Sequence, residues 1–296
     1  MEQIKVDPTV VAICAGTPGG FGFNSEWRKA AGKQYIDVGI AEEHAIAMSS
    51  GIAKNGGKPV FNVYSTFLQR TYDQLVQDLC VNNNSAVIIN HQASVYGMND
   101  VTHLGFFDIP MLTSIPNLVY LVPTNNEELL AMTEYAVHQH EHPVAIRVPV
   151  GEFISTGVAD TTDYSLLNKY EVTRRGEGIA LLGLGNFYHL ANQVADELAK
   201  VGINATVVNP KFASGLDEEL LKDLKVNHSV VFTLEDGVVE GGWGQRVASF
   251  YGPSAMRVKK YGFAKEFHDR YDAAELLQEN GVSVEQIVND SKSMLC

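Results

Sequence analysis

The residue types best suited to chemistry stand at the start of one predicted helix. The sequence predicts a short buried strand over 35–40 and a helix over 41–54, which a following Asn-Gly-Gly run ends. Glu42, Glu43 and His44 therefore lie in the first helical turn. Carboxylates are stabilised there by the helix dipole and by free backbone N–H groups, so a charged helix cap is the plain interpretation of the pair. The elements around the helix must decide whether either carboxylate does more.

Strands and helices alternate on both sides of this helix. The predicted strands of the first half cover 9–14, 35–40, 59–64, 86–90, 117–122 and 144–148, and its long helices cover 41–54, 66–80 and 126–139. Such alternation predicts a doubly wound parallel sheet with βαβ crossovers. The glycine-rich loop 16–22 matches neither a dinucleotide fingerprint nor a P-loop, so we interpret it as a connector.

A second unit follows a break in composition. Residues 151–164 are polar, rich in Gly, Thr and Asp, and without clear periodicity. Beyond them the alternation resumes, with strands predicted over 178–184, 205–209, 229–234 and 256–261, and helices over 188–201, 217–226, 242–251 and after Asp272. We predict an α/β protein of two doubly wound domains: 1–155, a linker over 156–175, and a smaller domain over 176–296.

Composition narrows the classes of function. The 296 residues are 45% apolar and 19% charged, enough to bury a large core, and the formal net charge of −13 argues against a nucleic-acid partner. The three cysteines are widely spaced and indicate neither a disulfide framework nor a zinc site. His138, His140 and His142 do not share a helix face, so we expect no metal site there. Without a signal peptide or a long apolar run, we expect a cytoplasmic protein with no membrane span.

Polar and aromatic residues gather where the predicted strands end. Ligands of open α/β sheets bind beyond the carboxyl ends of the strands. That rule selects four positions: 42–44, 64–70, 91–103 and Arg147. Acidic, aromatic, basic and imidazole groups would thus meet at one rim, which a purely structural protein does not need, although strand-end loops are often polar in any case.

Several runs at these loops resemble one family. The sequence contains, in order, DVGIAEEHAIAMSSGIA, VYSTFLQRTYDQLVQDL, VTHLGFFDI, IPNLVYLVPTNNEEL and VAIRVPVG. These closely resemble the C-terminal half of 1-deoxy-D-xylulose 5-phosphate synthase, within the transketolase family. Later runs, LLGLGN, NPKFASGLDEELL and TLEDGVVEGGWG, resemble the last domain of that family. The resemblance implies a domain that binds the pyrimidine of thiamine diphosphate, followed by a transketolase C-terminal-like domain.

The resemblance assigns roles near the cofactor. Glu42 is similar to the glutamate that activates the cofactor by sharing a proton with its aminopyrimidine ring, and Ile40 lies beside it in the cofactor site. Phe67 resembles the aromatic residue that stacks on that ring, although its helical spacing alone favours a core position. Glu43 lies about 100° further round the helix, so we assign it the role of a solvated cap.

The resemblance also implies substrate contacts. Tyr64 and Arg70 resemble residues of the substrate pocket, and His103 resembles a histidine that contacts substrate oxygens and moves protons. Their plainer interpretations are a solvated arginine at a helix start and a hydrogen-bonded loop histidine.

Three positions depart from the synthase pattern. Gln92 and Val150 stand where the synthase has arginines, and Asn99 stands where it has an aspartate. Two cationic anchors for an acceptor phosphate are therefore missing, while Arg147 remains and His91 stands where transketolases have a phosphate-contacting histidine. We expect His91, Gln92, Asn99 and Arg147 to contact a sugar-type substrate, and the sequence leaves open whether it is that of the synthase.

The family's magnesium-binding segment, Gly-Asp-Gly followed by Asn, does not occur in this sequence. In the family, Mg²⁺ and that segment hold the diphosphate. We therefore expect a partner half that binds the pyrophosphate, either a separate subunit or another domain of a longer enzyme. We also expect a dimer or heterotetramer, and no ketol transfer by this chain alone. Two alternatives stay open: a non-catalytic binding or regulatory subunit, and a 2-oxo acid dehydrogenase β-subunit, which the YSTFLQR and VTH runs fit less well. Residues 237–244 could bind an anion or serve helix–strand packing.

Overall fold

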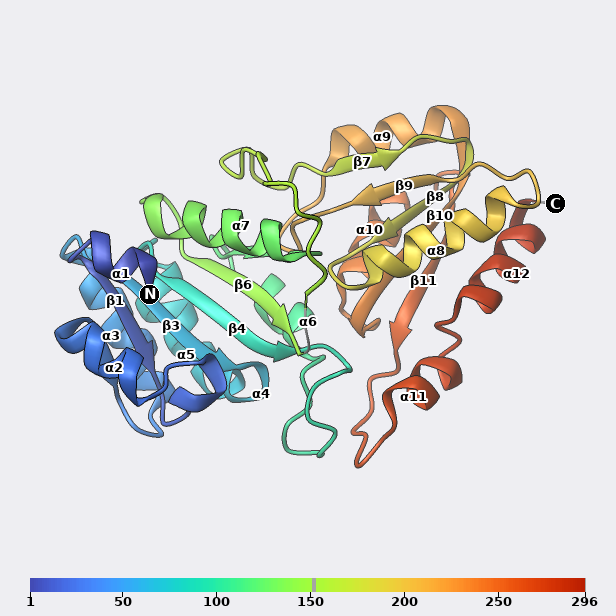
Figure 1. The fold of residues 1–296 in the computed structure, drawn as a ribbon. Helices are drawn as coiled ribbons and strands as arrows, with labels where there is room; N and C mark the ends of the chain where they lie inside the picture. Colours follow the sequence, from blue (N-terminus) through green and yellow to red (C-terminus); the bar gives the residue numbers. More distant parts are fainter. Residues whose placement is uncertain (151–152, 296) are drawn as a thin grey trace.

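The first domain is built on a parallel sheet. The computed structural model describes residues 1–150 and 153–295. Six strands lie in the order β2-β1-β3-β4-β6-β5, all parallel (Figure 1). They are β1 (Val10–Cys14), β2 (Tyr35–Asp37), β3 (Lys58–Tyr64), β4 (Val87–Ala93), β5 (Val119–Leu121) and β6 (Val144–Pro149). Because all six run the same way, their carboxyl ends meet at one edge, as the strand-end rule requires.

Helices cover both faces of this sheet. They are α1 (Glu2–Val6), α2 (Ser25–Ala31), α3 (Glu42–Lys54), α4 (Ser65–Leu68), α5 (Tyr72–Gln74), α6 (Asp108–Thr113) and α7 (Asn126–His138). Alternate strand residues divide between two cores: Phe61 and Ile88 pack with α3, whereas Val87 and Leu121 pack with α7. Burial on both faces explains why the strands read as nearly continuous apolar runs.

The structure corrects one predicted helix. Residues 66–80 do not form a single α-helix, because a 3₁₀ turn over Gln69–Thr71 separates α4 from α5, and a π-helix follows over Leu75–Cys80. The Thr71 hydroxyl is buried and donates a hydrogen bond of 2.8 Å to the Leu68 carbonyl, a local bond that competes with the helical pattern. The break places Arg70 at a bend beside α3.

The second domain has a mixed sheet. Its strands are β7 (Glu171–Arg174), β8 (Gly178–Gly183), β9 (Thr206–Asn209), β10 (His228–Val238) and β11 (Arg257–Phe263), in the order β11-β10-β8-β9-β7. The helices are α8 (Phe187–Ala199), α9 (Glu218–Asn227), α10 (Trp243–Tyr251), α11 (Ala273–Glu279) and α12 (Val284–Leu295). The prediction of two α/β domains is confirmed.

The predicted linker is partly wrong. Strand β7 lies within 156–175 and pairs antiparallel with β9, so the last part of that segment belongs to the second sheet. Its sequence, Glu-Val-Thr-Arg, alternates between exposed and half-buried residues, as expected at a sheet edge. Such a short polar strand gives almost no apolar signal. The first two residues of the 151–164 composition break lie outside the described residues.

The two domains share buried contacts at the end of β6. Arg147 lies between Asp108 of α6 and Asp236 of β10, and all three side chains are at most 1% exposed. A backbone bond of 2.8 Å from Val122 to the Lys211 carbonyl joins the first domain to the second nearby. The domains are therefore held by paired charges as well as by apolar packing.

The glycine-rich run over 237–244 serves packing. The buried Glu235 carboxylate accepts bonds of 2.8 Å from the backbone N–H groups of Trp243 and Gly244, at the start of α10. A Cβ atom on Gly244 would lie 2.9 Å from a Glu235 carboxylate oxygen. The protein's own carboxylate thus fills the helix N-terminus, and the alternative of an external anion at this position is wrong.

Candidate active site

Glu42 is positioned by a tight turn after β2. The Asp37 carboxylate accepts bonds of 3.0 Å from the backbone N–H groups of Gly16 and Gly39, and Gly39 has a left-handed backbone (φ 73°). Helix α3 then begins at Glu42, whose side chain is 3% exposed. Its Oε2 atom has no hydrogen-bond partner within the described chain. The charged neighbour of this oxygen is the half-exposed Arg70, at 3.4 Å. A buried carboxylate oxygen that accepts no hydrogen bond is rare in native proteins and marks a position where a ligand can supply a donor.

Arg70 distinguishes the two carboxylates. Its Nη1 lies 3.4 Å from Glu42 Oε2, and its Nε lies 3.2 Å from Glu43 Oε1. Glu43 is far more exposed than Glu42, and its pKa is lowered by a bond from its own backbone N–H and by Arg70. Glu43 therefore caps the helix and orients Arg70, while Glu42 is kept from water. About half of the Arg70 side chain is exposed, so it stays a candidate for binding substrate.

A row of rings lies along the strand ends. The Phe67 ring lies 5.7 Å from that of Tyr64 and 5.4 Å from the His103 ring, measured between centroids. Tyr64 lies 6.0 Å from His91 in the same way. The Thr66 hydroxyl donates a bond of 2.9 Å to the Thr102 carbonyl, which fixes the His103 loop against α4. The structure thus brings Tyr64, Phe67, His91 and His103 together, and pairs Glu42 with Arg70, which follows Phe67 by three residues. The chemical roles of all six stay predictions.

His91 and Gln92 lie at the end of β4. Burial lowers the pKa of His91, so its imidazole is neutral at pH 7, and its Nδ1 has no hydrogen-bond partner in the described chain. Gln92 has a left-handed backbone (φ 56°) at an irregularity in the pairing of β4 with β6. A Cβ atom on Gly105 would lie 2.0 Å from the Gln92 carbonyl oxygen, so only glycine fits opposite this kink.

Three predicted site residues have other surroundings. Arg147 is buried, and its guanidinium binds Asp108 at 2.7 Å and the Asp236 carboxylate, so the prediction that it contacts substrate is wrong. The Asn99 amide faces the second domain, donating a bond of 2.9 Å to the Tyr271 carbonyl. Ile40 is 80% exposed on the loop before α3, where its contact with cofactor stays a prediction.

Phe21 is a neighbour of the site that the sequence did not reveal. It lies on a 3₁₀ turn after β1, in the loop interpreted as a connector, with its ring 5.3 Å from Tyr64 and 5.4 Å from His91. A Cβ atom on Gly20 would lie 1.9 Å from the Tyr64 hydroxyl. The strand-end rule, applied to β1 as well, could have selected this loop.

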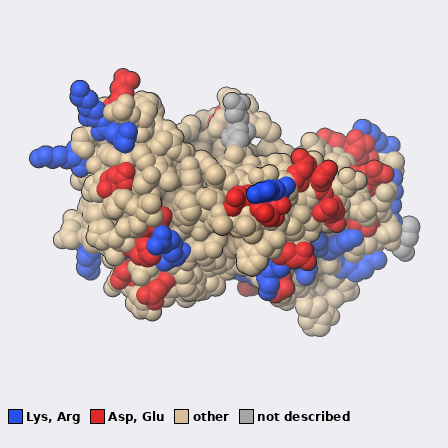
Figure 2. Space-filling model, turned by 90° about the horizontal axis from the view of Figure 1, so that it is seen from below, with Lys and Arg blue, Asp and Glu red and all other residues tan. Residues whose placement is uncertain are grey.

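Charge around the site is balanced within the chain. Arg70 faces two carboxylates, and His103 has Asp100 at 3.8 Å. On the face of the molecule drawn in Figure 2, acidic and basic side chains are interspersed, and no single-sign field covers it. The Val150 side chain lines a small cavity of 190 Å³ with Tyr96 and Phe153. The position at which the synthase has its second arginine is thus apolar here.

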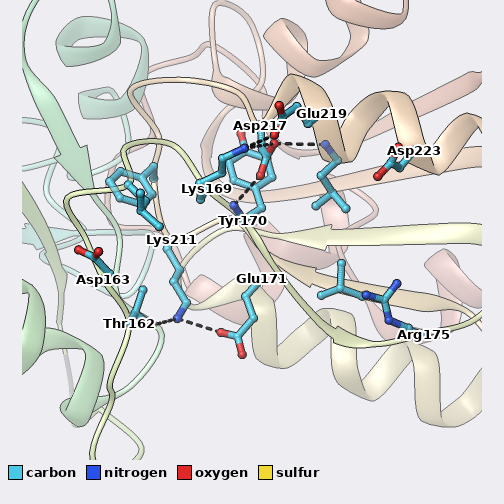
Figure 3. A pocket seen from close by; sticks show the side chains of 14 residues that line it. Thr162, Asp163, Lys169, Tyr170, Glu171, Arg175, Lys211, Asp217, Glu219 and Asp223 are labelled. Carbon is cyan, nitrogen blue, oxygen red and sulfur yellow. Dashed lines mark hydrogen bonds and ion pairs between the residues drawn. The ribbon is translucent and has the colours of Figure 1, made fainter.

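A larger cavity lies elsewhere. It measures 510 Å³ and is formed around β7 and the start of α9 (Figure 3). Its two lysines are already paired, Lys169 with Glu219 at 2.5 Å and Lys211 with Glu171 at 2.8 Å. Carboxylates outnumber basic groups in its wall, and none of the predicted site residues contributes to it. It is therefore separate from the candidate site.

Comparison with known proteins identifies the class. Residues 2–154 match the family description "Transketolase, pyrimidine binding domain", and residues 168–287 match "Transketolase, C-terminal domain". Among solved structures, "Split gene transketolase, inactive beta4 tetramer" shares the fold, with a TM-score of 0.83 over 99% of this chain and 94% of that one, at 22% identity. The chain belongs to the transketolase family.

Within that family, curated relatives point to one branch. A 1-deoxy-D-xylulose-5-phosphate synthase of Gloeothece citriformis is 36% identical over 96% of this chain and 45% of its own length. The synthase of Acidobacterium capsulatum is 38% identical over 93% of this chain and 44% of its own length. The chain therefore spans about half the length of these relatives, and it resembles their enzyme. Over residues 1–150 and 153–295, no helix is both long and apolar enough to cross a membrane.

Proposed function

We propose that this chain is the pyrimidine-binding half-site of a thiamine diphosphate-dependent enzyme that transfers a two-carbon ketol unit between sugar-type carbonyl substrates. The observation that carries the proposal is the buried Glu42 carboxylate, whose Oε2 accepts no hydrogen bond in the described chain and has the half-exposed Arg70 at 3.4 Å. Glu42 and Phe67 fit the aminopyrimidine of thiamine diphosphate, because this oxygen can take a ring nitrogen as its hydrogen-bond partner and the Phe67 ring offers a flat apolar surface.

Each residue then has a defined task. Glu42 Oε2 holds the proton shared with the ring nitrogen of the pyrimidine, in a site where little water competes for it. Phe67 orients the ring by stacking. When bound, thiamine diphosphate supplies a nucleophilic carbon and an electron sink for breaking and forming a carbon–carbon bond beside a carbonyl group.

Substrate oxygens meet the imidazoles and Tyr64. His103 Nδ1 contacts the Thr102 hydroxyl at 2.8 Å, which leaves Nε2 to donate to or accept from a substrate oxygen. His91 is neutral near pH 7 because burial lowers its pKa, so it offers a hydrogen bond and no charge. Arg70 is the exposed cation of the row, and Gln92 replaces a charge with an amide.

A partner half supplies the rest of the site. The chain covers about 45% of the synthase relatives, which supports a second chain or domain carrying the diphosphate and Mg²⁺ ligands. A solved structure of the same fold is described as "Split gene transketolase, inactive beta4 tetramer". By the same logic, we propose that the active form is a dimer or heterotetramer with the missing half, and that the isolated chain is inactive.

The test begins with the partner. Purification of the tagged chain from its native lysate should bring down a chain that contains the Gly-Asp-Gly segment, and ketol transfer should require both. Activity of this chain alone with thiamine diphosphate and Mg²⁺ would contradict the half-site proposal.

Adjacent carboxylates give a matched pair of variants. In the assembled enzyme, Glu42→Gln should lower kcat by about 10²–10⁴-fold, the usual contribution of a positioned acid or base. Glu43→Gln should keep most of the activity, because Glu43 reaches only Arg70 and the helix end. Equal effects of the two variants would remove Glu42 from the mechanism.

A non-catalytic subunit of the same fold is the second candidate. It is favoured by the loss of cationic contacts at Gln92 and Val150, and by an Asn99 amide that faces the second domain instead of the site. An assembled complex that binds thiamine diphosphate but transfers no ketol unit to any of a panel of aldoses and aldose phosphates would support it.

A further inference from the structure

The loop that carries His103 is attached to the second domain. We define the His103 loop as residues 94–105; it has no helix or extended strand, and a single bridge between Ser94 and Gly105 closes its base. A second segment, residues 264–272, connects β11 to α11 and is called the clasp. Figure 1 shows the two projecting from the same end of the molecule, at the bottom of the view.

Four hydrogen bonds join the loop to the clasp. The Arg270 N–H donates to the Asn99 carbonyl at 2.6 Å, and the Asn99 amide donates to the Tyr271 carbonyl at 2.9 Å. The Val101 N–H donates to the Asp269 carboxylate at 3.2 Å. The Tyr271 hydroxyl donates to the Val95 carbonyl at 2.8 Å, and burial raises the pKa of that hydroxyl to about 12, which keeps it a donor.

Both ends of the loop are anchored in the core of the second domain, where Val95 and Leu104 are buried. His103 contacts Thr102 and Asp100 of its own loop, and the loop reaches the first domain through the Thr66 bond and the edge of the Phe67 ring. Between these ends residues 96–102 are mostly exposed, and an exposed segment with little apolar contact opens at low free-energy cost. The clasp bonds at Asn99 and Val101 lie two to four residues from His103, so they restrict where its ring can stand.

The hydrogen bond from the Asn99 side chain to the clasp requires an amide. Its Nδ2 donates to a carbonyl oxygen, which a carboxylate cannot do because it only accepts. An aspartate in the same place would bring a negative oxygen against the Tyr271 carbonyl. The amide and the clasp therefore fit each other as a donor and an acceptor.

We propose that the clasp is a positioning element for His103: the second domain, through Asp269 and Tyr271, holds the imidazole at the site formed by the first domain. This inference rests on the proposed function for the role of His103. By this proposal, the C-terminal domain determines where the His103 ring lies, although its clasp residues come about 165 residues later in the chain.

The primary test uses the full-length chain and needs no activity. Asn99→Asp and Asp269→Ala should each change the His103 ring signals in ¹H–¹³C NMR spectra, assigned with His103→Gln. They should also speed exchange of the Val101 amide about tenfold, the change expected for the loss of one hydrogen bond. Glu266→Ala is the matched control, since Glu266 is an exposed clasp residue and, among the described residues, no hydrogen bond or ion pair joins its side chain to the loop. Unmoved His103 signals in both variants, with the fold intact, would overturn the proposal.

A second arm separates this inference from the proposed function. In the assembled enzyme, Asn99→Asp and Asp269→Ala should lower kcat/KM at least about tenfold, while the urea midpoint of each stays close to that of Glu266→Ala. If His103→Gln abolishes turnover and the clasp variants do not lower it, the clasp proposal fails and the proposed function stands. If His103→Gln leaves turnover unchanged while the clasp variants still shift the ring signals, the proposed role of His103 fails.

Discussion

Replacing Arg147 with methionine tests the interpretation of this residue as a buried joint between domains. The guanidinium binds Asp108 through Nε at 2.7 Å and Nη2 at 3.3 Å, and binds the Asp236 carboxylate through Nη1 and the Asp236 carbonyl at 3.1 Å through Nη2. Both aspartate side chains are 0% exposed. Arg147→Met leaves two carboxylates in the core without their cation.

The expected loss is large. Removing one partner of a buried ion pair destabilises a protein by about 3–5 kcal/mol, because the remaining charge cannot be rehydrated in place. Since whole proteins are stable by only about 5–15 kcal/mol, Arg147→Met should leave the chain close to unfolding at 25 °C. Arg174→Met is the matched control: its pair with Asp196 at 2.7 Å is 33% and 69% exposed, and such surface pairs contribute about 0.2–1 kcal/mol.

The assay is urea unfolding at pH 7, followed by far-UV circular dichroism. A triple variant, Arg147→Met with Asp108→Asn and Asp236→Asn, removes all three charges and should recover part of the lost stability. A midpoint for Arg147→Met no lower than that of Arg174→Met would refute the buried-joint interpretation. Failure of the triple variant to recover any stability would show that packing, and not the stranded charge, dominates.

Two further predictions concern Glu235 and Gly20. Burial raises the pKa of Glu235 to about 7, so the folded state holds this proton more tightly than the unfolded chain does. The proton therefore contributes roughly 3 kcal/mol to the free energy of unfolding. This contribution is fully present below about pH 4.5 and is lost as the pH rises through 7. Between pH 5 and pH 8, the urea midpoint should therefore fall less for Glu235→Gln than for the parent chain. An equal fall in both proteins would contradict this. Gly20→Ala places a Cβ atom 1.9 Å from the Tyr64 hydroxyl and should lower the free energy of unfolding by about 1–3 kcal/mol. Gly19→Ala is the control, because a Cβ atom there meets open space and should not lower the urea midpoint. Equal midpoints for the two variants would show that the loop adjusts without loss of stability.

Local pattern was enough for the first sheet and for part of the candidate site. Apolar runs with strand and helix spacing depend on neighbours within about four residues, so they predicted the alternation and its parallel order. The strand-end rule then selected Glu42, Tyr64, Phe67 and His103; the structure places the three rings in one row and pairs Glu42 with Arg70. Family resemblance supplied the cofactor, which no spacing in the chain could indicate.

The same pattern was insufficient where a residue's partner lies far along the chain. The sequence predicted a substrate-binding cation at Arg147, because the two carboxylates that bind it come from other elements, one of them 89 residues away. Asn99 read as a substrate residue because its acceptor lies 172 residues later. Strand β7 was not predicted, because an edge strand is defined by the strand it pairs with and not by its own side chains.

The sequence by itself therefore determined the fold class, the order of the elements and the position of Glu42 at the mouth of α3. Only the tertiary structure decided that Glu42 is buried with an oxygen that accepts no hydrogen bond while Glu43 is partly exposed, and that the second domain bonds to the His103 loop. The physical reason is that burial and hydrogen-bond partners are properties of the packed chain. Adjacent residues with identical side chains acquire different chemistry when the packing around each differs.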